Sequence, residues 1–124
     1  MFLSIKQFSE KTGVSEYTLR FYEKEGVLPF VNRNDSGNRV YDEQNLEWIE
    51  FITALRETGM PLSEIKRYVK LFKQGDSTIP ERKQMMMDHR VKVQEQLSQT
   101  LKHLEKVNYK LALYDVMLNT VNFP

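Results

Sequence analysis

The chain has 124 residues and a mass of 14.8 kDa, and its 18 basic and 17 acidic side chains give a formal net charge of +1. This length is about that of one domain, and the lack of cysteine excludes disulfides, thiolate metal sites and a cysteine nucleophile. Because no segment is strongly basic, any nucleic-acid binding must depend on a few placed Lys and Arg side chains rather than on bulk charge.

Two short helices joined by a tight turn are predicted at the N-terminus. Ser4 and Gln7 have the spacing of a capping box, which begins a helix that should end near Gly13. Ser15 can cap a second helix over about residues 16–25. Two helices of this length with so short a connection are the pattern of a helix-turn-helix.

A β-hairpin and two further helices are predicted next. Residues 27–41 are rich in turn formers, and we place the tip of the hairpin near residues 35–37. Asp42 is positioned to cap a helix over about residues 43–57, and the apolar spacing predicts another over about 61–73.

One long helix is predicted over about residues 80–118, after a linker at 74–77 and a capping-box pattern at Thr78 and Glu81. Its apolar residues alternate three and four apart, which is the coiled-coil pattern, and the chain has no second helix of matching length. We therefore expect a homodimer. The predicted dimerisation residues form two sets at seven-residue spacing: Val93, Thr100, Val107 and Tyr114, and Leu97, Leu104, Leu111 and Leu118.

The second predicted helix carries the strongest candidate for a DNA-binding surface. On a helical wheel Leu19 and Tyr22 lie on one side, whereas Tyr17, Arg20 and Lys24 lie on the opposite side. Arginine can donate a pair of hydrogen bonds to guanine, and a tyrosine hydroxyl can reach a phosphate. An ordinary amphipathic surface helix would show the same separation, so both interpretations stay open at this point.

Basic residues in the hairpin and the fourth helix, and a group of aromatic residues, could each serve binding or be ordinary surface and core. Arg33 and Arg39 in the hairpin suit a basic wing that contacts phosphates, as do the lysines and arginine between Lys66 and Lys73, but solvated surfaces explain both. Apolar side chains around Trp48, Phe51, Phe72 and Tyr114 could form a small-molecule pocket or ordinary core.

We expect no enzymatic activity, cofactor or metal site. The sequence has no glycine-rich phosphate loop and no Ser-His-Asp spacing, and its two histidines offer little material for a metal site. A cytoplasmic location is expected, because the N-terminus has no apolar signal core and no apolar run reaches the roughly 18 residues of a membrane span.

Residues 3–73 also carry a series of motifs at characteristic positions. They are Ser4-Ile5, Thr12-Gly13-Val14-Ser15, Thr18-Leu19-Arg20-Phe21-Tyr22-Glu23, Gly26-Val27-Leu28, Asn38-Arg39-Val40-Tyr41 and Gly59-Met60-Pro61-Leu62. With these motifs the chain resembles the DNA-binding domain of the MerR family of bacterial transcription regulators. The resemblance implies a winged helix-turn-helix homodimer that is joined by an antiparallel coiled coil.

The resemblance also implies roles for individual residues. By position, Tyr17, Thr18, Arg20 and Tyr22 would be recognition-helix contacts to DNA, Arg39 and Tyr41 would be wing contacts to the backbone, and Lys66 and Arg67 would fall in a second wing. In this family the dimer distorts a promoter with an overlong spacer so that RNA polymerase can engage it.

A narrower likeness points to the branch of the family that senses aldehydes or thiol stress. It is carried by Asp35-Ser36-Gly37, Tyr41-Asp42-Glu43 and the segment Trp48-Ile49-Glu50-Phe51-Ile52. The sensing cysteine of that branch would fall at about Ala54, and alanine has no thiolate to react with an electrophile. The likeness therefore supports the scaffold and not that switch, and leaves open whether any small-molecule effector exists.

Together these observations predict a mainly α fold, with a winged helix-turn-helix DNA-binding domain at residues 1–75 and a coiled-coil dimerisation helix at 76–124. The predicted function is a sequence-specific, homodimeric transcription regulator with an inverted-repeat operator, since two-fold protein symmetry is mirrored in the DNA site. The alternative is a coiled-coil interaction module whose helix-turn-helix docks a protein partner.

Overall fold

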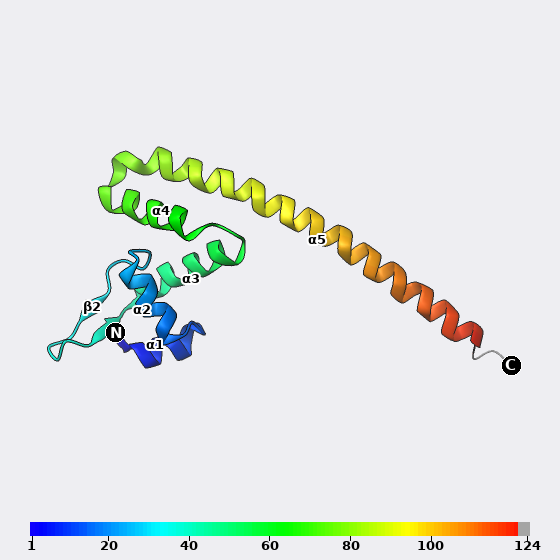
Figure 1. Ribbon diagram of the computed structural model, residues 1–124, viewed down its shortest axis with the longest axis horizontal. Coiled ribbons are helices and arrows are strands. Elements are labelled where there is room, and N and C mark those ends of the chain that lie inside the picture. The colour runs from blue at the N-terminus through cyan, green and yellow to red at the C-terminus, as the bar shows by residue number, and fades with distance from the viewer. Residues whose placement is uncertain (122–124) are drawn as a thin grey trace. The chain divides into compact units, whose positions relative to one another are not determined.

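The computed structural model describes residues 1–121. The chain divides into two compact units, Met1–Met85 and Met86–Pro124, and the last three residues of the predicted dimerisation segment, 122–124, lie outside the described part. The fold is mainly α with one small sheet, as the sequence predicts (Figure 1). Within residues 1–121 no helix is long and apolar enough to cross a membrane.

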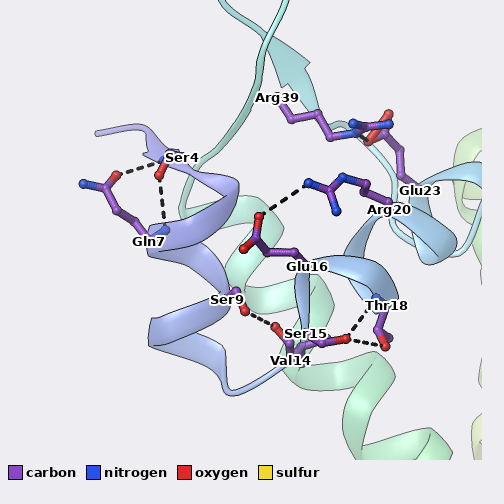
Figure 2. A network of polar contacts seen from close by, with 10 residues as sticks. All are labelled: Ser4, Gln7, Ser9, Val14, Ser15, Glu16, Thr18, Arg20, Glu23 and Arg39. Atoms are coloured by element: carbon purple, nitrogen blue, oxygen red, sulfur yellow. Dashed lines mark hydrogen bonds and ion pairs between the residues drawn. The ribbon is translucent and has the colours of Figure 1, made fainter.

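The helix-turn-helix is formed by α1, Ile5–Thr12, and α2, Glu16–Lys24. The predicted capping box at the start of α1 is confirmed. The Ser4 hydroxyl accepts from the Gln7 N–H at 3.2 Å, and the Gln7 side-chain carbonyl accepts from the Ser4 N–H at 2.9 Å (Figure 2). Both bonds satisfy backbone donors that a helix start leaves unpaired.

The connection between α1 and α2 is fixed by local hydrogen bonds. Gly13 ends α1 with a φ of +75°, in the left-handed region where glycine carries no Cβ penalty. The Ser9 hydroxyl donates to the Val14 carbonyl at 2.6 Å, and the Ser15 hydroxyl accepts from the Thr18 N–H at 3.1 Å, as predicted for a cap (Figure 2). These bonds set the direction in which α2 leaves the turn.

The wing is an antiparallel sheet of three short strands, β1 (Leu3–Ser4), β2 (Asn32–Arg33) and β3 (Arg39–Tyr41), in the order β1-β3-β2. The hairpin of β2 and β3 agrees with the prediction. β1 was not predicted, because it is only two residues long and merges with the cap of α1. In β1 Leu3 pairs with Tyr41, so the base of the wing is joined to the start of the helix-turn-helix.

The remaining helices are α3 (Glu43–Glu57), α4 (Leu62–Gln74) and α5 (Ile79–Val121), with a short 3-10 helix, η1 (Asp76–Thr78), in the predicted linker. Their positions confirm the helices predicted from the apolar spacing. α3 also has a capping box between Asp42 and Asn45.

The start of α5 belongs to the first unit, which continues to Met85. The Arg82 guanidinium lies 5.1 Å from the centre of the Phe72 ring on α4. Thr78 does not form the predicted box with Glu81. Its hydroxyl instead lies 2.6 Å from the Leu71 carbonyl, and the Glu81 carboxylate contacts α4.

The core of the first unit is made where α1, α2, the wing, α3 and α4 meet. Asn45 is fully buried there, and its side-chain amide donates to the Pro29 carbonyl at 3.1 Å while its side-chain oxygen accepts from the Asp42 N–H at 2.9 Å. One buried amide thereby ties the start of α3 to the segment that leads into the wing. The largest fully buried side chains include Phe8, Leu19, Leu28, Tyr41, Ile49, Ile52 and Ile65.

Candidate nucleic-acid interface

The outer face of α2 has the character predicted for a DNA-binding surface. Tyr17 is 79% exposed, and Arg20 and Lys24 are also exposed, whereas Leu19 on the opposite side is fully buried. Thr18 and Tyr22 are half-buried. The structure therefore brings Tyr17, Arg20 and Lys24 to one surface, whereas Tyr22 lies on the side of Leu19.

Arg20 is held by a weak contact that leaves it free to bind something else. Its guanidinium lies 3.4 Å from the Glu16 carboxylate one turn earlier in α2, and both side chains are about half exposed (Figure 2). Exposed ion pairs of this kind contribute about 0–1 kcal/mol. A phosphate or a guanine edge can therefore replace Glu16 at little cost.

The wing is tied to α2 by Glu23. The Arg39 Nε donates to the Glu23 carboxylate at 2.6 Å (Figure 2), and an Arg33 nitrogen lies 3.7 Å from the same carboxylate. Arg33 also donates to the Gly37 carbonyl at the hairpin tip at 2.9 Å. The sequence analysis missed Glu23, because its contact with Arg39 spans 16 residues and no local pattern records it.

Tyr41 is not on the surface, contrary to its expected role as a contact to the DNA backbone. It is fully buried, and its ring stacks on Phe8 with 4.4 Å between the ring centres and 5° between the planes. Burial, followed by the negative charge of Glu23, raises the pKa of its hydroxyl, and the hydroxyl has no hydrogen-bond partner among the described residues. Tyr41 is therefore a core residue at the base of the wing.

The two residues predicted for a second wing are exposed on α4, and each faces an acid. The Lys66 ammonium lies 3.8 Å from the Glu25 carboxylate, just beyond the end of α2, and Arg67 pairs with Glu81. Both pairs are about half exposed, so they contribute little to stability. Lys66 thus lies next to the end of α2, whereas Arg67 is directed to the start of α5.

The predicted dimerisation residues lie on an exposed helix. From residue 94 to 120 every residue of α5 is exposed, and Val93 is half-buried. The predicted apolar residues Leu97, Leu104, Val107, Leu111, Tyr114 and Leu118 are 51–59% exposed. Among residues 1–121 no group of three or more His, Asp or Glu side chains is placed to hold a metal ion.

Comparison with known families identifies this arrangement. Residues 3–71 match the sequence model of the MerR HTH family of regulatory proteins, and residues 46–109 match a second one, described as MerR, DNA binding. The chain belongs to the MerR family. It is therefore a DNA-binding transcription regulator, and the resemblance drawn from its motifs is confirmed.

Individual MerR relatives agree with this assignment. An uncharacterized HTH-type transcriptional regulator from Haemophilus influenzae is 42% identical over 106 residues, which are 86% of this chain and 78% of the relative. The HTH-type transcriptional regulator AdhR from Bacillus subtilis is 41% identical over 88 residues, 71% of this chain and 63% of AdhR.

Solved structures of MerR regulators have the same fold. The structure of HiNmlR, a MerR family regulator lacking the sensor domain, bound to promoter DNA, superposes with a TM-score of 0.86 at 39% identity, over 93% of this chain and 91% of that one. A MerR family regulator from Listeria monocytogenes also superposes with a TM-score of 0.86, at 32% identity, over 96% of this chain and 90% of that one.

Proposed function

We propose that this MerR regulator acts as a homodimer on an inverted-repeat operator, with α2 of each subunit in a major groove. The observation that carries the proposal is the outer face of α2, where Tyr17, Arg20 and Lys24 lie exposed together. Arginine and tyrosine suit base edges and phosphates respectively. Arg39, positioned by Glu23, serves the backbone beside the groove.

The exposed stripe on α5 supports the homodimer. Large apolar side chains that recur every seven residues on a free helix need a partner, and a second copy offers the same stripe. α5 has 43 residues, which at 1.5 Å each is about 65 Å of helix. In an antiparallel pair of such helices, the two α2 helices would lie farther apart than one DNA turn of about 34 Å.

Such a dimer would distort the promoter that it binds and so present it to RNA polymerase. Bending a site of 20–30 base pairs costs about 1–6 kcal/mol, which additional backbone contacts from the two wings offset. The proposal places this action in the cytoplasm and includes no catalytic step. HiNmlR, the similar regulator that was solved on promoter DNA, is in keeping with it.

The alternative is an interaction module that uses its helix-turn-helix to dock a protein. The arrangement of charges on α2 favours DNA, because its outer face carries Arg20 and Lys24 beside Tyr17. Salt separates the two functions: DNA binding weakens steeply as salt rises because counterions are released, and docking of a neutral protein surface does not.

The proposal is tested by selecting bound duplexes from a random pool and then measuring Arg20→Ala on the selected site and on random DNA. If Arg20 reads a base, the variant loses about 1–3 kcal/mol of binding free energy on the selected site and much less on random DNA. Lys11→Ala is the matched control, because it removes an exposed positive charge near the end of α1, outside α2.

Three results would count against the proposal. Selection that yields no duplex would remove the DNA-binding role, and enriched sites without two-fold symmetry would remove the inverted repeat. Equal weakening of Arg20→Ala on both kinds of DNA would make Arg20 a phosphate contact and shift base reading to other residues of α2.

A further inference from the structure

The first unit has an open pocket on the surface of α3 and α4 that the DNA-binding role does not use. Its volume is about 290 Å³, near the lower end of the roughly 300–1,000 Å³ range of small-molecule sites. Four of its six lining residues are aromatic, and the other two are polar. The lining residues are Gln44, Glu47, Trp48, Phe51, Tyr68 and Phe72.

The aromatic rings are set at steep angles to one another. Trp48 lies 4.9 Å from Phe72 at 86° and 6.2 Å from Tyr68 at 61°, between ring centres. Phe51 lies 6.5 Å from Trp48 and 5.6 Å from Tyr68. Rings that meet at such angles and distances pack edge to face against one another, so the pocket offers a ligand only the ring surfaces that remain open to solvent.

The pocket is not closed core. Trp48 is 8% exposed and forms its floor, but Phe51 and Tyr68 are only half-buried and Phe72 is 37% exposed. Apolar rings left open to solvent in this way gain from being covered. Of the residues expected from the sequence to surround a pocket, Trp48, Phe51 and Phe72 line it, whereas Tyr114 belongs to the second unit.

One acidic side chain, Glu47, lines the pocket. Glu47 is exposed on α3, and its carboxylate makes no ion pair with any residue in the described part of the chain. None of the six lining residues is basic. The Arg82 guanidinium already lies 5.1 Å from the centre of the Phe72 ring, so the ring surfaces left for another cation are chiefly those of Trp48, Phe51 and Tyr68.

We propose that this pocket binds a small organic cation, of the quaternary or aromatic ammonium class, against the open surfaces of its aromatic rings and the Glu47 carboxylate. A cation within about 6 Å of an aromatic ring centre is attracted by the negative face of the ring, and aromatic cages are used to recognise quaternary ammonium groups. A neutral molecule of the same shape would gain the apolar contacts and lose both electrostatic contributions.

Trp48 makes the test direct, because it is the only tryptophan of the chain and forms the pocket floor. The 124-residue chain is titrated with benzyltrimethylammonium while its tryptophan fluorescence is followed. The titration is repeated with neopentylbenzene, which has the same shape without the charge. We expect saturable quenching by the cation and at least tenfold weaker binding of the neutral compound.

Glu47→Gln removes the charge and keeps the size of the side chain, so we expect it to weaken the cation about three- to tenfold and to leave the neutral compound unchanged. Glu50→Gln is the matched control, since Glu50 is exposed on the same helix and does not line the pocket. Both positions are on the surface, and circular dichroism will establish that the variants are folded.

Equal binding of the two compounds would overturn the proposal and make the site merely apolar. An absence of saturable quenching would also overturn it. If Trp48 resists quenching by acrylamide at high protein concentration and becomes accessible on dilution, a second copy of the chain covers the pocket instead. These outcomes are separate from the DNA-binding proposal, because Arg20→Ala should lose operator affinity and keep cation binding.

Discussion

Replacing Tyr41 by phenylalanine separates a core role from a DNA contact at the base of the wing. The ring stacks on Phe8 and is fully buried, and its buried hydroxyl has no hydrogen-bond partner in the described part of the chain. A buried polar group without a partner costs about 1–3 kcal/mol. Because Tyr41→Phe keeps the ring stack and removes only that group, we expect the free energy of unfolding to stay constant or rise by about 1 kcal/mol.

The assay is urea denaturation followed by circular dichroism and by the fluorescence of Trp48, together with operator affinity. Tyr22→Phe is the matched control, because it makes the same chemical change at a half-buried residue of α2. We expect Tyr41→Phe to bind the operator within about twofold of the parent chain. If Tyr22 contacts a phosphate, its variant loses roughly 1 kcal/mol of binding free energy.

The pH dependence gives an independent check. Burial and then the charge of Glu23 raise the pKa of Tyr41, while nearby arginines, Arg39 first, act in the opposite sense. Since the unfolded pKa is about 10, the stability due to the neutral phenol is complete below pH 10 and is lost as pH rises through the higher folded value. The advantage of Tyr41→Phe should therefore grow above pH 10. A loss of more than about 1 kcal/mol at pH 7, or a tenfold loss of operator affinity, would refute the core assignment.

Two further changes test the dimer and the wing support. Leu104→Asp should place a charge from each subunit in the apolar stripe of α5 and weaken the proposed dimer by at least about 3 kcal/mol, measured by sedimentation. Asn108→Asp on the same helix is the control. A dimer that stays intact in Leu104→Asp would contradict the predicted role of Leu104 in dimerisation. Asn45→Ala should lower the free energy of unfolding by about 2–4 kcal/mol, because it leaves the buried Pro29 carbonyl unpaired and breaks the cap of α3, whereas exposed Gln44→Ala should cost less than about 0.5 kcal/mol. If Asn45→Ala and Gln44→Ala lower the free energy of unfolding equally, the buried Asn45 amide contributes no more to stability than an exposed side chain.

Helix positions could be predicted from the sequence because their signals are local. Ser4 with Gln7, Ser15 and Gly13 act within four residues of where they stand, so the starts and ends of α1 and the start of α2 are as predicted. The exposed face of α2 followed from the same periodicity.

The hairpin of the wing could be predicted from its turn formers, but the surroundings of its side chains could not, because long-range contacts decide them. Arg39 and Tyr41 are two apart in β3, and alternation along a strand puts them on one face. What separates them is their place along the strand: Arg39 meets Glu23 on α2, and Tyr41 lies at the base, over Phe8. Neither contact leaves a trace in the local sequence.

If the exposed apolar stripe along α5 pairs with a second copy as proposed, gene control becomes dependent on protein abundance. Where free subunits are scarcer than their dimerisation constant, the amount of proposed dimer rises as the square of the subunit concentration. A twofold change in synthesis then alters promoter occupancy by about fourfold, without any ligand. In the proposed dimer, the sharpness of this response depends on how tightly the two copies associate through the α5 residues predicted to pair, Leu104 among them.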